Sequence, residues 1–171
     1  MSRFFSAVCL FAALSPVTAQ ESAPQSFPSG TPAWFITSAR PAATATMDVG
    51  RLEKQGEIAV SMSALYYVTP QESANGPVDF IQTLDAYDCS QPGHVKNVMG
   101  EGYKVGQQPP VFAYNNPEAI WKFYSAGSPG MDSWKAACEG PLRELQVKNV
   151  KTHEQVLEVV RQQARELDAK P

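Results

Sequence analysis

Residues that can act as nucleophiles, acids or bases are few in this sequence and lie far apart. It contains two histidines, His94 and His153. His94 follows a glycine in an expected turn, where we expect a solvated ring. His153 lies in the first turn of an expected helix, where the helix dipole disfavours its charged form. Ser61 and Ser63 lack the Gly-x-Ser-x-Gly context of many hydrolase nucleophiles. Because no nucleophile has a base and an orienting group near it in sequence, we expect no catalytic residues.

Three aspartates, Asp79, Asp85 and Asp88, fall within a segment that we expect to be a strand. Paired carboxylates can act as a general acid and base or bind Ca²⁺. Positions 85 and 88 are three apart, so their side chains should point to opposite faces of a strand, and calcium-loop spacing is absent. We therefore expect no joint carboxylate site, no metal and no cofactor. Aspartates inside a strand suggest that one face of that strand is solvated.

The first residues of the chain predict export. Arg3 supplies a positive charge, residues 4–14 are apolar, and Val17-Thr18-Ala19 places small residues before a cleavage site. This pattern is typical of a Sec-type signal peptide over residues 1–19. The apolar run of about ten residues is too short to span a membrane, and Cys9 lies too early for a lipid-anchor motif. We expect a periplasmic or secreted protein without a membrane span and without an evident lipid anchor.

Export changes the interpretation of the cysteines. Cys89 and Cys138 survive signal cleavage, and an even number of cysteines in an oxidising compartment predicts a disulfide. The loop that this bond closes, of about 50 residues, corresponds to a stabilisation of roughly 4 kcal/mol in the chain-entropy description. The alternative is a metal site formed by Cys89 and His94, which lacks a second pair of ligands.

The composition describes a globular chain without a dominant charge. Of 171 residues, 43% are hydrophobic and 18% are charged, and 14 Lys and Arg stand against 17 Asp and Glu, for a net charge of -3. This length suits one domain. Because no basic field covers the domain, nucleic acid and anionic membrane surfaces are excluded as default partners.

Alternating hydrophobicity predicts an antiparallel sheet. The clearest strand covers residues 57–69, where every second position is almost always apolar and should face the core. Pro70 should end this strand, and a turn containing Asn75-Gly76 leads into a returning strand. Gly100 and Gly102 imply a bulge or bend in the next strand. Further strands are expected over 34–37, 44–49, 78–89, 94–105 and 120–124, with loops over 50–56 and 106–117.

Helices follow the strands. Ser128-Pro129 is typical of a helix start, and the helical spacing of Trp134 and Cys138 places both on one inward face. Trp134 is therefore expected in the core. An aromatic binding surface that also includes Trp34 and Trp121 stays an alternative.

A last helix is expected over residues 152–169, opened by the capping-box spacing of Thr152 and Gln155. Apolar residues form a stripe along it: Val156, Leu157, Val160, Ala164 and Leu167. An isolated helix of this length is marginal in water, so the stripe should pack on something. The protein's own sheet is one candidate, and a partner helix or a second copy of the chain is the other.

Strands first and helices last predict an α+β fold. We expect an antiparallel β-sheet of about 4–6 strands, with C-terminal helices and one disulfide, Cys89–Cys138. A flexible leader rich in serine and proline should cover residues 20–33, the domain residues 34–140, and a helical extension residues 141–171.

An ordered set of motifs indicates a family. It consists of Thr46-Met47-Asp48, the strand from Glu57, Tyr87-Asp88-Cys89, Trp121–Ser128 and Ser133–Cys138. In this order the sequence resembles the surface-adhesin protein E-like domain family of Gram-negative bacteria, over roughly residues 34–138. The resemblance implies an exported envelope or secreted binding module without catalysis, whose partner is a protein or a host matrix component. The family provides no binding residues that match here, so the binding residues stay unassigned.

Two other functions stay open. One is an exported hydrolase whose site is assembled only in three dimensions, and the other is a structural or inhibitory envelope protein that docks through its last helix. A cavity that brings His94 or His153 near serine and aspartate side chains would favour the enzyme. An aromatic surface or exposed strand edge without perturbed carboxylates would favour the binding module.

Overall fold

The computed structural model describes residues 32–141, 146–147 and 152–168. The expected signal peptide, residues 1–19, and most of the expected leader lie outside these residues. None of the helices in the described ranges combines the length and the apolar character that a membrane span needs.

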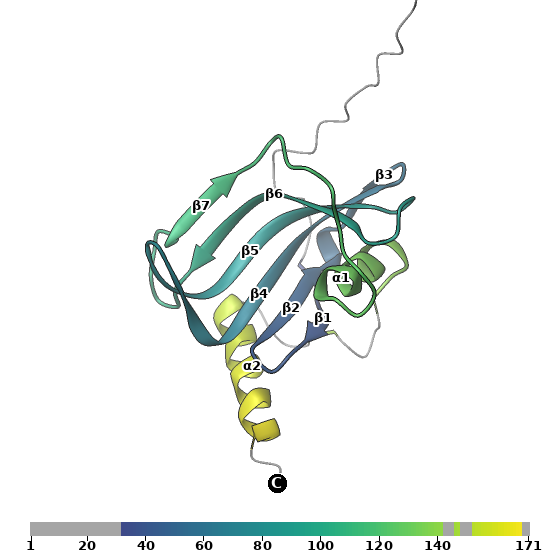
Figure 1. Ribbon diagram of the computed structural model, residues 1–171. Helices are drawn as coiled ribbons and strands as arrows, with labels where there is room; N and C mark the ends of the chain where they lie inside the picture. Colours follow the sequence, from purple (N-terminus) through teal and green to yellow (C-terminus); the bar gives the residue numbers. More distant parts are fainter. Residues whose placement is uncertain (1–31, 142–145, 148–151, 169–171) are drawn as a thin grey trace, which may run out of the picture.

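One antiparallel sheet organises the fold, with strands in the order β1-β2-β4-β5-β6-β7 (Figure 1). Each strand of this path is antiparallel to its neighbours, so the chain runs largely as a meander. The elements are β1 (Trp34–Ala39), β2 (Ala43–Asp48), the short 3₁₀ helix η1 (Val49–Arg51), β3 (Glu53–Gln55), β4 (Ile58–Ser73), β5 (Gly76–Asp88), β6 (His94–Tyr103), β7 (Phe112–Asn115), β8 (Lys122–Phe123), α1 (Pro129–Cys138) and α2 (His153–Asp168).

The expected α+β class is confirmed, but the expected strand count is wrong. The sheet has eight strands rather than about 4–6, because β3 and β8 add short segments. β3 pairs with the start of β4, beyond the part that β2 pairs with, and β8 pairs with the start of β6, beyond the part that β7 pairs with. The sheet is therefore six strands wide. Strands as short as β3 and β8 carry too few residues for alternation to reveal them.

The β4–β5 hairpin runs further than the sequence predicted. β4 continues through Pro70, where we expected it to end. The register with β5 is irregular between Tyr66 and Gln71, so Pro70 lies where the ladder is already interrupted. Proline has no N–H to donate, and this is a position where a strand tolerates it. The ladder then resumes and closes at the turn before Gly76, whose φ is +120°.

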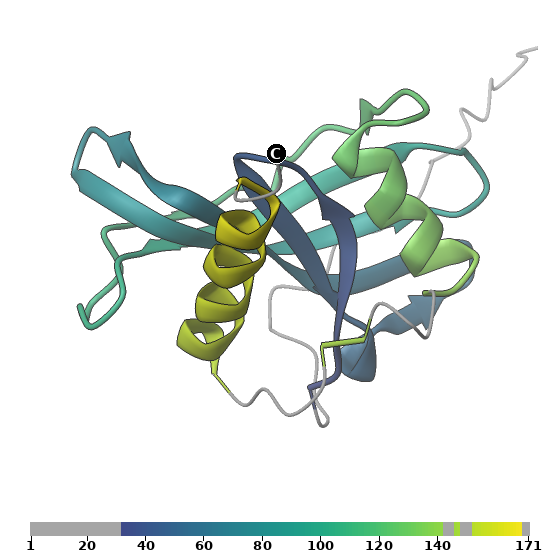
Figure 2. The same ribbon diagram turned by 90° about the horizontal axis from the view of Figure 1, so that it is seen from below.

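The two helices cover opposite faces of the sheet (Figures 1 and 2). Along β4, Ala59 packs with the α1 cluster, whereas Ala64 and Tyr66 pack with the α2 cluster. Successive residues of a strand point to opposite faces, so odd-numbered positions of β4 face α1 and even-numbered positions face α2. We refer to these as the α1 face and the α2 face.

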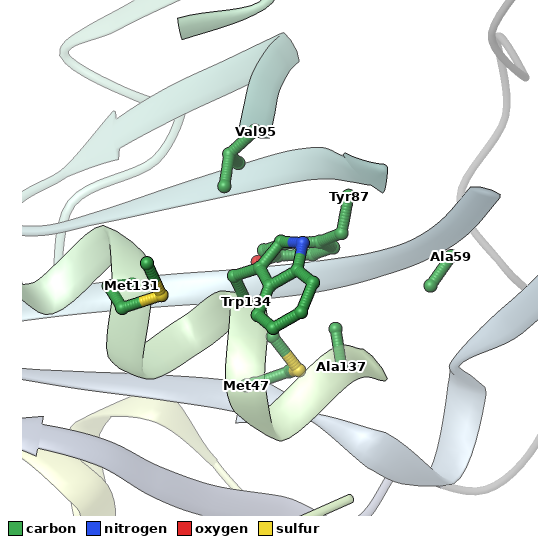
Figure 3. Close-up of a cluster of buried hydrophobic side chains, with 7 residues drawn as sticks. All are labelled: Met47, Ala59, Tyr87, Val95, Met131, Trp134 and Ala137. Atoms are coloured by element: carbon green, nitrogen blue, oxygen red, sulfur yellow. The ribbon is translucent and has the colours of Figure 1, made fainter. Parts of the chain in front are cut away.

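Helix α1 forms as its sequence predicted and is fixed at its C-terminal end. Ser128 caps it, since its Oγ accepts a hydrogen bond from the Met131 N–H at 3.3 Å. Trp134 is buried, and its Nε1 donates to the Asp88 carbonyl at 2.7 Å. The predicted disulfide is confirmed, with the sulfur atoms of Cys89 and Cys138 2.10 Å apart. Figure 3 shows the cluster that α1 forms with the sheet: Met47, Ala59, Tyr87, Val95, Met131, Trp134 and Ala137.

Helix α2 packs on the protein's own sheet rather than on a partner helix. Its capping box is confirmed, because the Thr152 N–H donates to Gln155 Oε1 and the Gln155 N–H donates to Thr152 Oγ1, each at 3.3 Å. Buried α2 residues join the cluster on the α2 face: Val156, Leu157 and Val160, against Ala64, Tyr66 and Phe80. The helix of the expected C-terminal extension thus shares a core with the strands. The side chain of Leu167, the last member of the predicted stripe, lies outside the described residues.

Strand β7 corrects the expectation of a loop over residues 106–117. It pairs with β6 so that Tyr114 lies opposite Gly100 and Phe112 opposite Gly102. A Cβ atom at either glycine would collide with the ring of its partner. These glycines therefore allow close approach of aromatic rings, whereas the bulge that we expected from them lies earlier, where β6 and β5 shift register next to Asp85.

Candidate functional site

The aspartates that we expected on a solvated face are buried, and the expectation is wrong. Asp79, Asp85 and Asp88 are 6–8% exposed, and Asp48 at the end of β2 is fully buried. The physical reason is that β5 lies inside the sheet, between β4 and β6, where neighbouring side chains such as Asn97 and Arg161 lie over its carboxyls. A buried carboxylate loses its hydration and has to be compensated by partners, which makes each of the four informative.

Two of the four form ion pairs with arginine. Asp48 Oδ2 lies 2.5 Å from Arg51 Nε, and Asp79 Oδ1 lies 2.5 Å from a terminal nitrogen of Arg161. Arg161 belongs to α2, and its Nε also donates to the Val68 carbonyl at 3.1 Å. These two carboxylates are compensated within the fold, and the second one helps to hold α2 on the sheet.

Asp88 organises a turn. Its Oδ1 accepts hydrogen bonds from the backbone N–H and the hydroxyl of Ser90, at 3.0 and 2.6 Å, and its Oδ2 accepts from the Gln91 amide at 2.9 Å. Such a side-chain cap of a turn is an ordinary structural use of aspartate. Asp88 pairs in register with Ile58, an even-numbered position, so it lies on the opposite face from Asp85, as the three-residue spacing predicted.

Asp85 neither forms an ion pair nor caps a turn. Its Oδ1 accepts from Asn97 Nδ2 at 2.5 Å, and its Oδ2 accepts from the hydroxyls of Thr83 and Tyr87 at 3.0 and 3.3 Å. Among the described residues, no lysine, arginine or histidine forms an ion pair with it. Burial raises the pKa of the Asp85 carboxyl, and the hydrogen bonds from these neutral groups only partly offset that effect.

An open cavity of about 340 Å³ lies on the α1 face, with Asp85 in its floor. The walls are mostly apolar or aromatic, and the polar groups gather around the carboxyl. We call this space the Asp85 cavity. Its lining residues come from the sheet, from the segment after β8 and from the first turns of α1: Ala45, Ser63, Ala64, Leu65, Ile81, Thr83, Asp85, Tyr87, Val95, Asn97, Tyr114, Tyr124, Pro129, Gly130 and Ser133.

Three tyrosines share this cavity with Asp85. The Tyr87 hydroxyl lies 2.8 Å from Ser63 Oγ and also donates to Asp85. Burial, together with the charge of Asp85, raises the pKa of Tyr87, Tyr114 and Tyr124, so all three hydroxyls stay protonated at neutral pH. The three rings and the carboxyl line the same cavity.

Two glycines fix the rings at the sides of the cavity. A Cβ atom on Gly100 would meet the Tyr114 ring at 2.7 Å, and one on Gly130, in the first turn of α1, would collide with the Tyr124 ring. Tyr114 and Tyr124 thus rest directly on backbone, one from β7 and one from the segment between β8 and α1. Any other residue type at positions 100 and 130 would push these rings away.

Ser61 and Ser63 have different surroundings in the structure. Ser61 is buried, and its Oγ donates to the Asp48 carbonyl at 2.7 Å, so it stabilises the end of β2. Ser63 lines the Asp85 cavity, but its hydroxyl partner is Tyr87 rather than an imidazole.

Neither histidine lines the Asp85 cavity. His94 is half-buried beside Phe123, with ring centroids 5.6 Å apart, and its Nδ1 has no hydrogen-bond partner among the described residues. The expectation of a solvated His94 ring is therefore wrong. The physical reason is that β8 pairs with the start of β6 and brings Phe123 against the ring.

His153 packs on the α2 face. Its ring stacks on Phe80 with centroids 5.0 Å apart, and its Nδ1 lies 2.6 Å from the Tyr66 hydroxyl. Burial lowers the pKa of His153, so its charged form is disfavoured. His153 borders a smaller cavity of about 160 Å³, lined also by Glu154 and Tyr103 but by no serine or aspartate. In neither cavity does a histidine meet serine and aspartate, which was the arrangement that would have favoured a hydrolase.

The three tryptophans do not share one surface. Trp134 lies in the core with α1, and Trp34 packs against clusters on the α2 face. Trp121 is partly exposed just before β8, with the Lys96 ammonium 4.7 Å from its ring centroid. The neighbouring Ile120 and Phe123 are exposed as well. Together with Trp121 they form an exposed apolar and aromatic patch at β8.

Sequence reasoning singled out Asp85 but missed the residues around it. Tyr114 lay in an expected loop and Tyr124 at the end of an expected strand without a partner. A usable signal was the pair of glycines two positions apart, Gly100 and Gly102, facing the aromatic pair Phe112 and Tyr114 with the same spacing. Small residues on one strand opposite large rings on the next indicate pairing of the two strands.

The arrangement is suited to binding. One buried carboxyl, three neutral phenols and apolar walls can orient a small molecule, and no histidine lines the cavity. Among the described residues, no three His, Cys, Asp or Glu side chains come together as a metal site. No family model, no curated protein and no solved structure matches this chain.

Proposed function

We propose that this protein is an exported binding module of the cell envelope or the medium, without catalysis, and that the Asp85 cavity is its ligand site. The observation that carries the proposal is Asp85 itself. It is buried in the floor of an open cavity, and its described partners are all uncharged.

Burying such a group is unfavourable for folding alone. An unpaired buried carboxylate is disfavoured by several kcal/mol unless it is protonated or paired, and apolar residues of similar size usually stabilise a core more. Asp48 and Asp79 have arginine partners, and Asp88 caps a turn. Because Asp85 has none of these structural uses, a ligand is the partner that accounts for its position.

The size and the lining of the cavity support a small organic ligand. Its volume of about 340 Å³ lies within the range of about 300–1,000 Å³ that is usual for such sites. Apolar walls provide contact area, and the group around Asp85 provides orientation. Ser63 contacts the Tyr87 phenol and not an imidazole, so the cavity holds no Ser–His pair of the kind that many hydrolases use.

The proposal also includes a protein partner, which would bind a second surface of the molecule, away from the Asp85 cavity. The resemblance to surface-adhesin protein E-like domains supports adhesion to a protein or host matrix component. The exposed edge at Ile120, Trp121 and Phe123 is apolar and aromatic, and this favours a macromolecular contact there. An adhesin-like envelope module that also holds a small ligand is consistent with both features.

The test is to fill the cavity. Leu65 lines it from β4, so Leu65→Trp should occupy the space without removing a polar group. Tyr67→Trp is the matched control, because Tyr67 lies on the same strand and the same face but outside the lining. A library of small metabolites would be screened against the chain from residue 20 onward by ligand-observed NMR.

We expect ligands that bind the wild type and the Tyr67→Trp variant but not the Leu65→Trp variant. If every ligand found also binds the Leu65→Trp variant with unchanged affinity, the Asp85 cavity is not the site. Circular dichroism spectra of both variants should match the wild type, which separates loss of the site from loss of the fold.

A further inference from the structure

We infer that the Asp85 cavity selects small organic cations, specifically substituted ammonium compounds. The inference rests on the proposed function, since it assumes that this cavity binds a ligand. It names the chemical class of that ligand from three independent features: the charge of the lining, the aromatic groups and the volume.

The charge of the lining has one source. Among the residues that line the cavity, Asp85 is the only one that carries a formal charge. Its described hydrogen-bond donors are neutral, so a negative charge in the cavity has no counter-ion within the fold. A bound cation would supply the partner that Arg161 supplies to Asp79 in the same strand. A bound anion would place two like charges together in a poorly hydrated space.

The aromatic groups fit the same ligand. Tyr87, Tyr114 and Tyr124 line the cavity together with the carboxyl. Rings that surround a positive charge attract it through their quadrupoles, and this is how aromatic cages hold quaternary ammonium groups. Gly100 and Gly130 hold two of these rings at the sides of the space. The cavity therefore combines an anionic floor with aromatic walls.

The first turn of α1 also borders the cavity, and a helix N-terminus favours anions. Here that effect is largely cancelled by local groups. Pro129 has no N–H, and the Met131 N–H donates to the Ser128 cap. Asp132 in the first turn is paired with Arg40 at 3.6 Å, so these two charges offset each other. The carboxyl of Asp85 therefore determines the sign of the charge that the cavity favours.

The volume limits the ligand. A space of about 340 Å³ lies near the lower end of the usual range for small-molecule sites. It suits a single ammonium head group with a short substituent, such as choline, rather than a long or polycyclic amine.

The experiment compares three probes of nearly one shape. Choline carries the cation, its uncharged analogue has carbon in place of nitrogen, and the anion of tert-butylacetic acid carries the opposite charge. Each is titrated into the ¹⁵N-labelled chain from residue 20 onward, with the amide signals of Gly100 and Gly130 as reporters beside the cavity rings. Wild type, Asp85→Asn, Tyr114→Leu and Tyr114→Phe are compared.

We expect choline to bind the wild type at least about tenfold more tightly than the uncharged analogue, and the anion to bind least. Asp85→Asn should lose most of the preference for choline over the uncharged analogue and keep only the part that the aromatic rings supply. Tyr114 is on the surface side of the cavity, so its replacement should leave the fold intact. Tyr114→Leu should weaken choline binding several-fold, and Tyr114→Phe, which keeps the ring, should restore it.

The outcomes separate the two proposals. Equal binding of choline and the uncharged analogue by the wild type overturns the selection of cations and leaves the cavity as a binding site. Tighter binding of the anion overturns the selection as well. If none of the probes shifts the reporter signals while a screened ligand does, the cavity binds another class, and if no small molecule shifts them, the proposed function fails together with the inference.

Discussion

Asp79 and Asp85 lie in the same strand, β5, and each is 6% exposed. Asp79 faces the guanidinium of Arg161 at 2.5 Å, and this contact joins the strand to α2. Asp85 receives hydrogen bonds from neutral side chains only and lies in the floor of a cavity. Within one strand, the chain thus buries one carboxylate that is neutralised by an arginine of the fold and a second carboxylate that has no cationic partner.

The faces of the sheet differ in the same way. Helix α2, with 16 residues, packs Val156, Leu157 and Val160 against the strands. The cavities that border it, of about 160 and 220 Å³, are smaller than the Asp85 cavity. Helix α1, with 10 residues, packs its core residues at the end of the sheet that holds the disulfide. The rest of the α1 face is left as the Asp85 cavity. The difference indicates that stability comes mainly from the α2 face and the disulfide end, while the middle of the α1 face is available for a ligand.

The largest effect is expected on the α2 face. Val160 is buried in the cluster there, so Val160→Asp places an unpaired charge in the core and should lower the free energy of unfolding by about 2–4 kcal/mol. Urea denaturation measures the change. Val159→Asp is the control, because the neighbouring Val159 is 37% exposed and its replacement should cost well under about 1 kcal/mol. Equal losses for the two variants would show that α2 is not docked as described.

The next effect concerns the ion pair that holds α2. Arg161→Met leaves Asp79 buried without its cation, and we expect a loss of about 1–3 kcal/mol. Arg165→Met is the matched control, since Arg165 is exposed one turn further along the same helix. Adding Asp79→Asn to Arg161→Met should recover part of the loss. No recovery would mean that the guanidinium acts mainly through its hydrogen bond to the Val68 carbonyl.

Asp85→Asn should behave in the opposite way. Removing a charge that has no cation should leave stability at neutral pH unchanged or raise it by about 1 kcal/mol, whereas Asp79→Asn should lower it. Thermal or urea denaturation of both variants measures the contrast. A large loss of stability in Asp85→Asn would show that Asp85, like Asp79, stabilises the fold.

The pH dependence of this difference has a definite sign. Burial raises the pKa of Asp85, so the folded state holds the proton to a higher pH than the unfolded state, whose carboxyl titrates near about 4. As the pH rises from about 4 to the folded-state pKa, the wild type should therefore lose stability relative to Asp85→Asn. Above the folded-state pKa the difference should stay constant. A difference that does not change with pH would contradict the raised pKa.

The smallest effect is expected at Gly100. Gly100→Ala brings a Cβ atom against the Tyr114 ring, which is 40% exposed and able to move, so the loss of stability should stay below about 1 kcal/mol. The shifted ring should still weaken choline binding. In a Tyr114→Ala background the same substitution should have no effect on stability, and a persistent loss there would show that the glycine serves the backbone of β6 instead.

Local sequence signals predicted the elements but not what covers them. The alternation in β4, the Ser128 cap and the Thr152–Gln155 box are all local, and all were found. The expected turn was found too, but it is shorter and consists of Ala74 and Asn75, with Gly76 already in β5. Burial of Asp85 depends on side chains from other elements, such as Asn97 of β6 and Tyr114 of β7, and the alternation within β5 carries no information about them. We read the aspartates as solvated for this reason.

The site was harder to predict than the fold because its parts are distant in sequence. Tyr114 reaches Asp85 only through the pairing of β7 with β6, and Tyr124 only through its seat on Gly130 of α1. β7 is four residues long, too short for alternation to distinguish it from a loop. The disulfide was predictable because the expected export leaves two cysteines, and pairing two residues requires no knowledge of the fold.

The most direct measurement is a titration of the Asp85 carboxyl itself, followed by ¹³C NMR of the side-chain carboxyl carbons with and without choline. Because burial raises its pKa, Asp85 should titrate at higher pH than an aspartate of ordinary pKa, such as one in an unfolded chain at about 4. Choline stabilises the charged form, so it should lower that midpoint in the wild type, and the uncharged analogue should leave it in place. A titration midpoint of about 4 for Asp85 that choline does not change would contradict the proposal that Asp85 is a buried carboxyl that binds a cationic ligand.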